Sequence, residues 1–208
     1  MRPFNRLFAI SSLFVAVAVV AFSPAPQAPD PLPIGATAPL TDEALMDVSG
    51  TEITLAQIAG DNGLLVIFSC NDCPWVKKWE DRYISISQMA QASGIGMVAL
   101  NSNEKDRADT ESLEAMQARA SEMNYDFRYA VDKDHKLADA YGASRTPDVF
   151  LFNADLALVY TGAIDDNARD AAAVEHAYLA NAMTAMLAGE PIADEVTKSI
   201  GCTIKRLR

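Results

Sequence analysis

Two cysteines that follow a short apolar run constrain this chain more than any other feature. Residues 64–68 are all apolar, and the segment Cys-Asn-Asp-Cys-Pro follows at residues 70–74. An apolar run of this length predicts a buried strand, and the helical spacing of apolar residues after Pro74 predicts a helix. Because proline is tolerated in the first turn of a helix, we expect the helix to begin near Cys70 or Asn71. The two thiols should then lie together at a strand-to-helix turn.

Cys70 is expected to be the reactive thiol of the pair. The first turn of a helix carries unpaired N–H groups and the positive end of the helix dipole, both of which favour an anion. They lower the pKa of a thiol placed there, and the thiolate is the nucleophilic form of cysteine. Cys73 lies one turn further on and can close a short disulfide with Cys70. The sequence thus predicts that Cys70 is the more exposed and more acidic thiol, and that Cys73 resolves the covalent intermediate.

Two other uses of a Cys-x-x-Cys pair stay open. Half of a zinc site would need a second Cys or His pair at close spacing, whereas Cys202, His135 and His176 are isolated from one another. Inert structural cysteines are the second alternative. We favour redox chemistry, and we expect neither a metal nor a cofactor.

The first residues of the chain resemble a targeting segment. Arg2 and Arg6 precede an apolar run at residues 7–22. The length of this run suits a signal peptide better than a full membrane span. We therefore expect a cleaved signal peptide or an uncleaved membrane anchor at residues 1–25. A proline-rich linker at 26–33 and one domain at 34–208 should follow. The domain should be exported, either periplasmic or anchored to the outer face of the cytoplasmic membrane, where disulfides persist.

The charge of the chain limits its partners. With a net charge of −11 over 208 residues, binding to nucleic acid or to anionic lipid is disfavoured. The expected partners are disulfides and thiols of proteins or small molecules, and a redox protein that donates or accepts electrons. Contact with a membrane is expected only through the N-terminal segment, if that segment stays uncleaved.

Strand and helix patterns alternate along the rest of the chain. A hairpin is expected around Gly50, and further strands are expected at residues 95–100, 127–131, 148–152 and 157–160. Helical patterns cover residues 75–90, 113–123, 137–141 and 178–186. This order predicts a three-layer α/β sandwich.

Several motifs, in order along residues 34–208, carry a family resemblance. They are Ile34-Gly35-x-x-Ala38-Pro39, Phe68-x-Cys70-Asn71-x-Cys73-Pro74, Asn101-Ser102-Asn103, Tyr141-Gly142-Ala143, Thr146-Pro147-Asp148, Gly162-x-Ile164-Asp165-Asp166-Asn167 and Gly201-Cys202-x-Ile204-Lys205. With these motifs the chain resembles the thioredoxin-like redoxins. Within them it resembles a peroxiredoxin-like subgroup (alkyl hydroperoxide reductase/thiol-specific antioxidant type) that carries a Cys-x-x-Cys. The resemblance implies a thioredoxin-like sandwich with a central mixed sheet, an N-terminal hairpin, and a cis bond at Pro147 facing the cysteine pair.

The resemblance leaves the reaction of this subgroup open, and thiol–disulfide exchange is the leading hypothesis for the activity. Cys70 would attack a substrate disulfide and Cys73 would resolve the mixed disulfide. Thr146 would offer backbone groups to an extended peptide, and Pro147 would shape the groove. Trp75 is a candidate to line the site, with core packing as the alternative.

The sequence also departs from the thioredoxin pattern. Ser69 stands where thioredoxin has Trp, and Asn71-Asp72 replace Gly-Pro between the cysteines. Leu64 lies near the position of the buried carboxylate of thioredoxin and cannot replace it. The charge of Asp72 should raise the thiol pKa values and oppose the helix dipole. Whether the pair acts as an oxidant or as a reductant therefore stays open.

Two further functions are weighed against exchange. Peroxiredoxins carry Thr or Ser three residues before the peroxidatic cysteine and Pro seven before it. Neither Cys70 nor Cys73 has these residues, although Arg145 could supply the guanidinium. Copper-delivery proteins of the thioredoxin fold have three residues between the cysteines and a nearby His. The spacing here is one residue short, and His135 lies ten residues before Arg145, where that family has its His.

Cys202 is the odd cysteine of the chain. It lies beyond the last predicted helix, in a tail short enough to fold back over the sheet. One hypothesis makes it a third redox thiol that exchanges with the pair. The other makes it a small buried hydrophobic residue, which free cysteines commonly are.

Overall fold

The computed structural model describes residues 30–207, and strand β3 (Gly63–Ser69) lies at the centre of its sheet. All seven residues of β3 are buried. Because side chains alternate across a strand, its apolar residues divide between two clusters on opposite faces of the sheet. Leu64, Val66 and Phe68 belong to one cluster, and Leu65 and Ile67 belong to the other. A strand buried on both faces explains the continuous apolar run in the sequence.

The sheet has seven strands in the order β2-β1-β5-β4-β3-β7-β8. The strands around β3 are β1 (Leu45–Asp47), β2 (Glu52–Ile53), β4 (Ile95–Asn101), β5 (Arg128–Val131), β7 (Asp148–Phe152) and β8 (Leu158–Gly162). β4 runs parallel to both β3 and β5, while the other pairs are antiparallel. The expected mixed sheet is confirmed, and the N-terminal hairpin β1–β2 joins it through β5.

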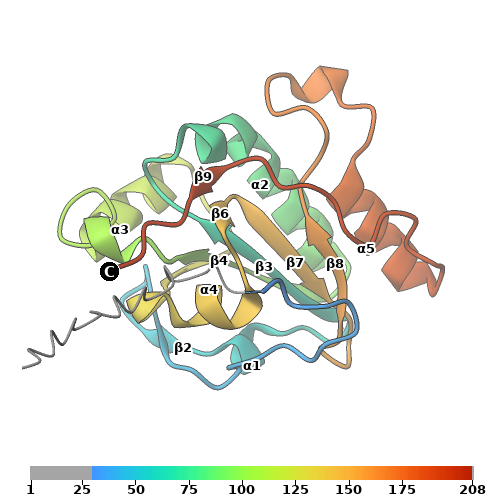
Figure 1. Cartoon of the computed structure of the whole chain (residues 1–208), viewed down its shortest axis with the longest axis horizontal. Coiled ribbons are helices and arrows are strands. Elements are labelled where there is room, and N and C mark those ends of the chain that lie inside the picture. The colour runs from blue at the N-terminus through green and yellow to red at the C-terminus, as the bar shows by residue number, and fades with distance from the viewer. Residues whose placement is uncertain (1–29, 208) are drawn as a thin grey trace, which may run out of the picture.

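Helices cover both faces of the sheet and complete three layers (Figure 1). One face is covered by α2 (Pro74–Ala92), α3 (Leu113–Glu122) and α5 (Tyr178–Ala188). The other is covered by α1 (Leu55–Ile58) and α4 (Lys136–Tyr141). Short 3-10 turns lie at Glu104–Asp106, Lys133–His135 and Ala171–Ala173. The thioredoxin-like α/β sandwich expected from the sequence is therefore the fold of this chain.

The described N-terminal residues lie against the domain. The Leu32 N–H donates to the carbonyl of Tyr141 at 3.1 Å, and the side chains of Leu32 and Ile34 pack on the core. Residues 30–33, which the sequence assigns to the linker, thus pack with the domain because Leu32 finds apolar contacts beside α4. The predicted signal peptide or anchor lies outside the described residues. Within residues 30–207, no helix is long and apolar enough to cross a membrane.

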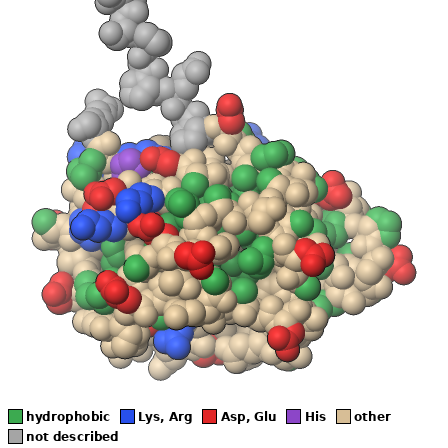
Figure 2. All heavy atoms as spheres, turned by 90° about the horizontal axis from the view of Figure 1, so that it is seen from below, with side chains coloured by type: hydrophobic (Ala, Val, Ile, Leu, Met, Phe, Trp, Pro, Cys, Tyr) green, Lys and Arg blue, Asp and Glu red, His purple; other side chains and the backbone are tan. Residues whose placement is uncertain are grey.

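The acidic charge is dispersed over the face seen from below in Figure 2. Acidic side chains are scattered across this face, while most of the Lys and Arg side chains gather beside acidic ones at one side and others lie apart at the edges (Figure 2). A nucleic-acid interface is normally an extended basic stripe or patch. The described residues form no such stripe on this face.

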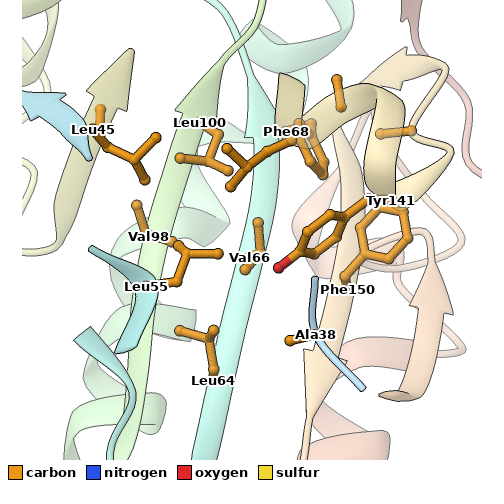
Figure 3. Close-up of a cluster of buried hydrophobic side chains, with 14 of the residues drawn as sticks. Ala38, Leu45, Leu55, Leu64, Val66, Phe68, Val98, Leu100, Tyr141 and Phe150 are labelled. Carbon is orange, nitrogen blue, oxygen red and sulfur yellow. The ribbon is translucent and has the colours of Figure 1, made fainter. Parts of the chain in front are cut away.

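An aromatic group fills the core beside α4 (Figure 3). The Tyr141 ring packs edge-on against Phe68 and Phe150, with ring centroids 5.6 Å and 5.4 Å away. Its hydroxyl is buried and has no hydrogen-bond partner among residues 30–207. A buried hydroxyl without a partner costs free energy that its removal would restore.

We predict that Tyr141→Phe raises the free energy of unfolding by about 1 kcal/mol. Tyr160→Phe is the matched control, because the Tyr160 hydroxyl bonds to the carbonyl of Ala163 at 2.5 Å and to Thr197 Oγ1 at 2.7 Å. This control should lower the free energy by about 1–2 kcal/mol. Urea unfolding followed by circular dichroism measures both. Equal destabilisation by the two substitutions would show that the Tyr141 hydroxyl has a partner, such as a buried water.

Candidate functional site

The site forms where the end of β3 meets the start of β7. These strands are antiparallel, with Phe68 opposite Asp148, so the residues just beyond them are brought together. Cys70 follows β3, and Thr146 ends the short strand β6 (Arg145–Thr146), one residue before β7. The Thr146–Pro147 peptide bond is cis. The cis bond beside the cysteine pair, expected from the family resemblance, is therefore present.

Both sulfurs of the pair contact Thr146. Cys70 Sγ lies 3.2 Å from Thr146 Oγ1, and Cys73 Sγ lies 3.2 Å from the Thr146 carbonyl oxygen. Both cysteines are reduced, and their exposed fractions are 3% for Cys70 and 2% for Cys73. Exposure therefore does not distinguish the two thiols, and the expectation that Cys70 is the more exposed one stays a prediction. The pair is a buried one.

The helix that follows the pair begins later than expected. Pro74 is the first residue of α2, and Cys73 is its N-cap. Proline suits this first position because it has no N–H to leave unpaired and its φ angle is already helical. The free N–H groups and the positive end of the dipole therefore act on Cys73 more directly than on Cys70.

The acidity of the two thiols is the reverse of the expected order. Hydrogen bonding from the Cys70 thiol is the main cause that lowers the pKa of Cys73 to about 4, and the Cys202 thiol and the Thr146 hydroxyl act in the same direction. The same bond to Cys73, together with burial, raises the pKa of Cys70. The negative charge of Glu111 raises it further. These effects favour ionisation of Cys73 over ionisation of Cys70.

We predict that the ultraviolet absorbance of a thiolate titrates with a pKa of about 4 in the reduced protein. Cys73→Ala should remove this absorbance at pH 6. Cys70→Ala should shift the titration to higher pH, because the thiolate then loses its main hydrogen-bond donor. If the acidic titration survives in Cys73→Ala and disappears in Cys70→Ala, the thiolate belongs to Cys70, as the sequence suggested.

A buried carboxylate holds the turn that carries the cysteines. Glu111 is fully buried and accepts hydrogen bonds from the backbone N–H groups of Asn71, at 2.9 Å, and Asp72, at 3.3 Å. The side-chain amides of Asn101 and Asn103 donate to it as well, at 2.6 Å and 3.3 Å. The asparagines were visible in the sequence as a motif at the end of a strand. Glu111 was missed, because a single acidic residue in an acidic loop gives no signal.

We predict that Glu111→Gln lowers the free energy of unfolding by about 2–3 kcal/mol. A glutamine amide would face N–H donors and leave at least one of them unpaired. The loss of the negative charge should also lower the pKa of Cys70, so iodoacetamide should alkylate Cys70 faster. Glu175→Gln removes the same charge at an exposed position. It should alter the free energy of unfolding by less than about 0.5 kcal/mol. An unchanged alkylation rate in Glu111→Gln would contradict this role.

Trp75 and Arg145 occupy different positions relative to the pair. Trp75 is half-buried and packs on the apolar cluster that contains both thiols, with Lys78 Nζ 4.4 Å from the centre of its ring. Arg145 is exposed, and its side chain makes no hydrogen bond within the described residues. The Arg145 side chain is thus exposed whereas both thiols are buried. Trp75 thus flanks the site, and Arg145 lies on the surface beside it.

The C-terminal tail closes the site. Strand β9 (Cys202–Thr203) pairs antiparallel with β6, so that Cys202 lies opposite Thr146 (Figure 1). We expected Thr146 to offer its backbone to a bound peptide. In this structure, the chain's own tail occupies that edge instead, because the tail returns across the sheet after α5.

A cavity in the described part of the chain lies elsewhere. Its volume is about 670 Å³, and its lining includes the first residues of β4 and the start of β5. Parallel strands place their carboxyl ends at the opposite edge of the sheet, where Cys70 lies. None of the site residues named above lines this cavity.

Comparisons with known proteins agree with this geometry. The model of the family described as Redoxin matches residues 33–178. Two solved structures are 33% identical to this chain: an uncharacterized conserved protein from Geobacillus kaustophilus and a hypothetical protein from Sinorhizobium meliloti. The first has a TM-score of 0.77 and covers 84% of this chain and 93% of its own. The second has a TM-score of 0.78 and covers 86% and 97%.

A more distant structure shares the fold alone. A peroxidoxin from Mycobacterium tuberculosis is 15% identical, with a TM-score of 0.55 over 74% of this chain and 96% of its own. No curated protein sequence matches the chain.

Proposed function

This chain belongs to the Redoxin family, and on that premise we propose that it is a thiol–disulfide oxidoreductase whose Cys70–Cys73 pair cycles between dithiol and disulfide. The observation that carries the proposal is that both sulfurs, which lie just before α2, contact Thr146. Two thiols held against one residue, with one of them ionised, are arranged for thiolate attack followed by ring closure.

The proposed cycle follows from the acidity of the thiols. The Cys73 thiolate attacks one sulfur of a substrate disulfide, so that a Cys73–substrate bond forms and the other substrate sulfur leaves as a thiolate. Cys70 then gives up its proton and attacks Cys73 Sγ, which releases the second substrate thiolate. The substrate gains two electrons and the pair loses two. The released thiolates take up protons, and an external dithiol restores the pair.

A thiol peroxidase is the second candidate function. The position of Arg145 favours exchange over peroxide reduction, because its guanidinium is exposed while the thiols are buried. The missing Thr and Pro before either cysteine argue in the same direction. Copper delivery has less support, since the spacing of the cysteines is one residue short.

The partners and the compartment belong to this proposal as well. Disulfides of proteins or small molecules, and a redox protein that exchanges electrons with the pair, are the proposed partners. Export to the periplasm, or anchoring at the outer face of the cytoplasmic membrane, is proposed from the character of residues 1–25.

We predict that the protein accelerates the reduction of insulin by dithiothreitol, and that Cys73→Ser lowers this rate at least 100-fold, because the attacking sulfur is gone. In a Cys202→Ser background, Cys70→Ser should accumulate a Cys73–substrate disulfide, which mass spectrometry of the intact protein detects. Hydrogen peroxide should be consumed no faster than by free dithiothreitol. Rapid peroxide turnover without insulin reduction would favour the peroxidase. A mixed disulfide trapped on Cys70 would show that Cys70 attacks first and Cys73 resolves, as the sequence predicts.

A further inference from the structure

The tail that carries Cys202 is fixed on both sides of the cysteine. Before it, Ser199 Oγ lies 2.5 Å from Asp148 Oδ1. After it, the Ile204 N–H donates to the carbonyl of Ser144 at 3.1 Å, and the Ile204 side chain is buried in the core. The Lys205 N–H donates to Asn103 Oδ1 at 2.9 Å. Cys202 is therefore held in place by an ordered segment.

Gly201 allows the tail to approach β6 closely. A Cβ atom at this position would lie 2.4 Å from the Thr146 carbonyl oxygen, closer than any real contact of this kind. Only glycine fits such an approach of one backbone to another. The tail is thus seated against the residue that both sulfurs of the pair contact.

The side chain of Cys202 lies on the face of β6 that meets the pair. Residues directly opposite each other in an antiparallel pair extend their side chains to the same face. Thr146 lies opposite Cys202, and Thr146 Oγ1 reaches Cys70 Sγ. Cys202 accordingly packs against the apolar cluster that contains Cys70 and Cys73, and Trp75 belongs to the same cluster.

Exposure distinguishes Cys202 from the other two cysteines of the chain. Cys70 and Cys73 are buried, whereas Cys202 is partly exposed. A partner thiol that approaches the folded protein can therefore reach Cys202 more readily than it reaches the pair. A route for exchange between the buried pair and the surface exists through this third thiol.

We propose that Cys202 is a third redox-active thiol. It exchanges with the Cys70–Cys73 disulfide and forms a Cys73–Cys202 disulfide that is accessible at the surface. This inference rests on the proposed thiol–disulfide exchange function. The Cys202 thiolate attacks Cys73 Sγ of the Cys70–Cys73 disulfide. A Cys73–Cys202 bond forms, the Cys70–Cys73 bond breaks, and Cys70 leaves as a thiolate that takes up the proton lost by Cys202. No electrons are gained or lost, and an external thiol then reduces the exposed disulfide.

The charge on Cys73 fits this order of events. In the reduced protein, burial and then the neighbouring Cys73 raise the pKa of Cys202, so Cys202 stays protonated. Oxidation of the pair removes that charge. Cys202 can then ionise more readily, at the stage when its attack is needed.

Oxidation of the Cys70→Ala variant tests the proposal. The full chain carrying this change has two cysteines, Cys73 and Cys202, and oxidised glutathione should join them. The number of free thiols after denaturation should fall from two to none, and non-reducing peptide mapping should recover a Cys73–Cys202 peptide. The double variant Cys70→Ala/Cys202→Ser is the matched control and should form no internal disulfide. Wild-type protein at equilibrium should yield both the Cys70–Cys73 and the Cys73–Cys202 peptides.

Three outcomes separate this inference from the proposed function. If wild-type protein forms the Cys70–Cys73 disulfide and reduces insulin, but Cys70→Ala keeps two free thiols, the role of Cys202 is refuted and the function stands. If wild-type protein does neither, the function itself fails. A Cys70–Cys202 disulfide that forms as fast in Cys73→Ala as Cys73–Cys202 does in Cys70→Ala would refute the assignment of Cys73 as the partner. Circular dichroism of each variant confirms that it is folded.

Discussion

The antiparallel pairing of β3 with β7 is the constraint on which the site depends. It brings Phe68 opposite Asp148, so the cysteine turn after β3 and the residue before Pro147 must meet. Burial of β3 on both faces fixes this register, because a shift by one residue would turn its apolar side chains to the wrong layers. Both sulfurs then contact Thr146. The chemistry of the site is thus a consequence of how the central strand packs.

Two local features of the fold determine the distribution of charge around the cysteine pair. Pro74 starts α2 and makes Cys73 its N-cap, so the favourable helix terminus acts on the second thiol. Glu111 lies beneath the turn and bonds to the N–H groups of Asn71 and Asp72, so its negative charge disfavours ionisation of Cys70. Both effects favour a proton on Cys70 and ionisation of Cys73.

The C-terminal tail affects how a substrate peptide can bind at the site. In a thioredoxin-like protein with a free edge at the cis-proline, an extended peptide can add a strand beside it. Here the edge of Thr146 is already paired with Cys202, and Ile204 anchors the tail in the core. The tail therefore places a third sulfur beside the pair, which makes intramolecular exchange a step of the proposed cycle.

The sequence by itself determined the fold class, the strand and helix pattern, and the cysteine pair at a strand-to-helix turn. These depend on periodicity and on local residue preferences, which can be read along the chain. The order of acidity, the role of Glu111 and the position of Cys202 opposite Thr146 were decided only by the tertiary structure. Each depends on residues that lie far apart in the sequence. Their burial and mutual distance arise when the sheet closes, and no local pattern encodes them.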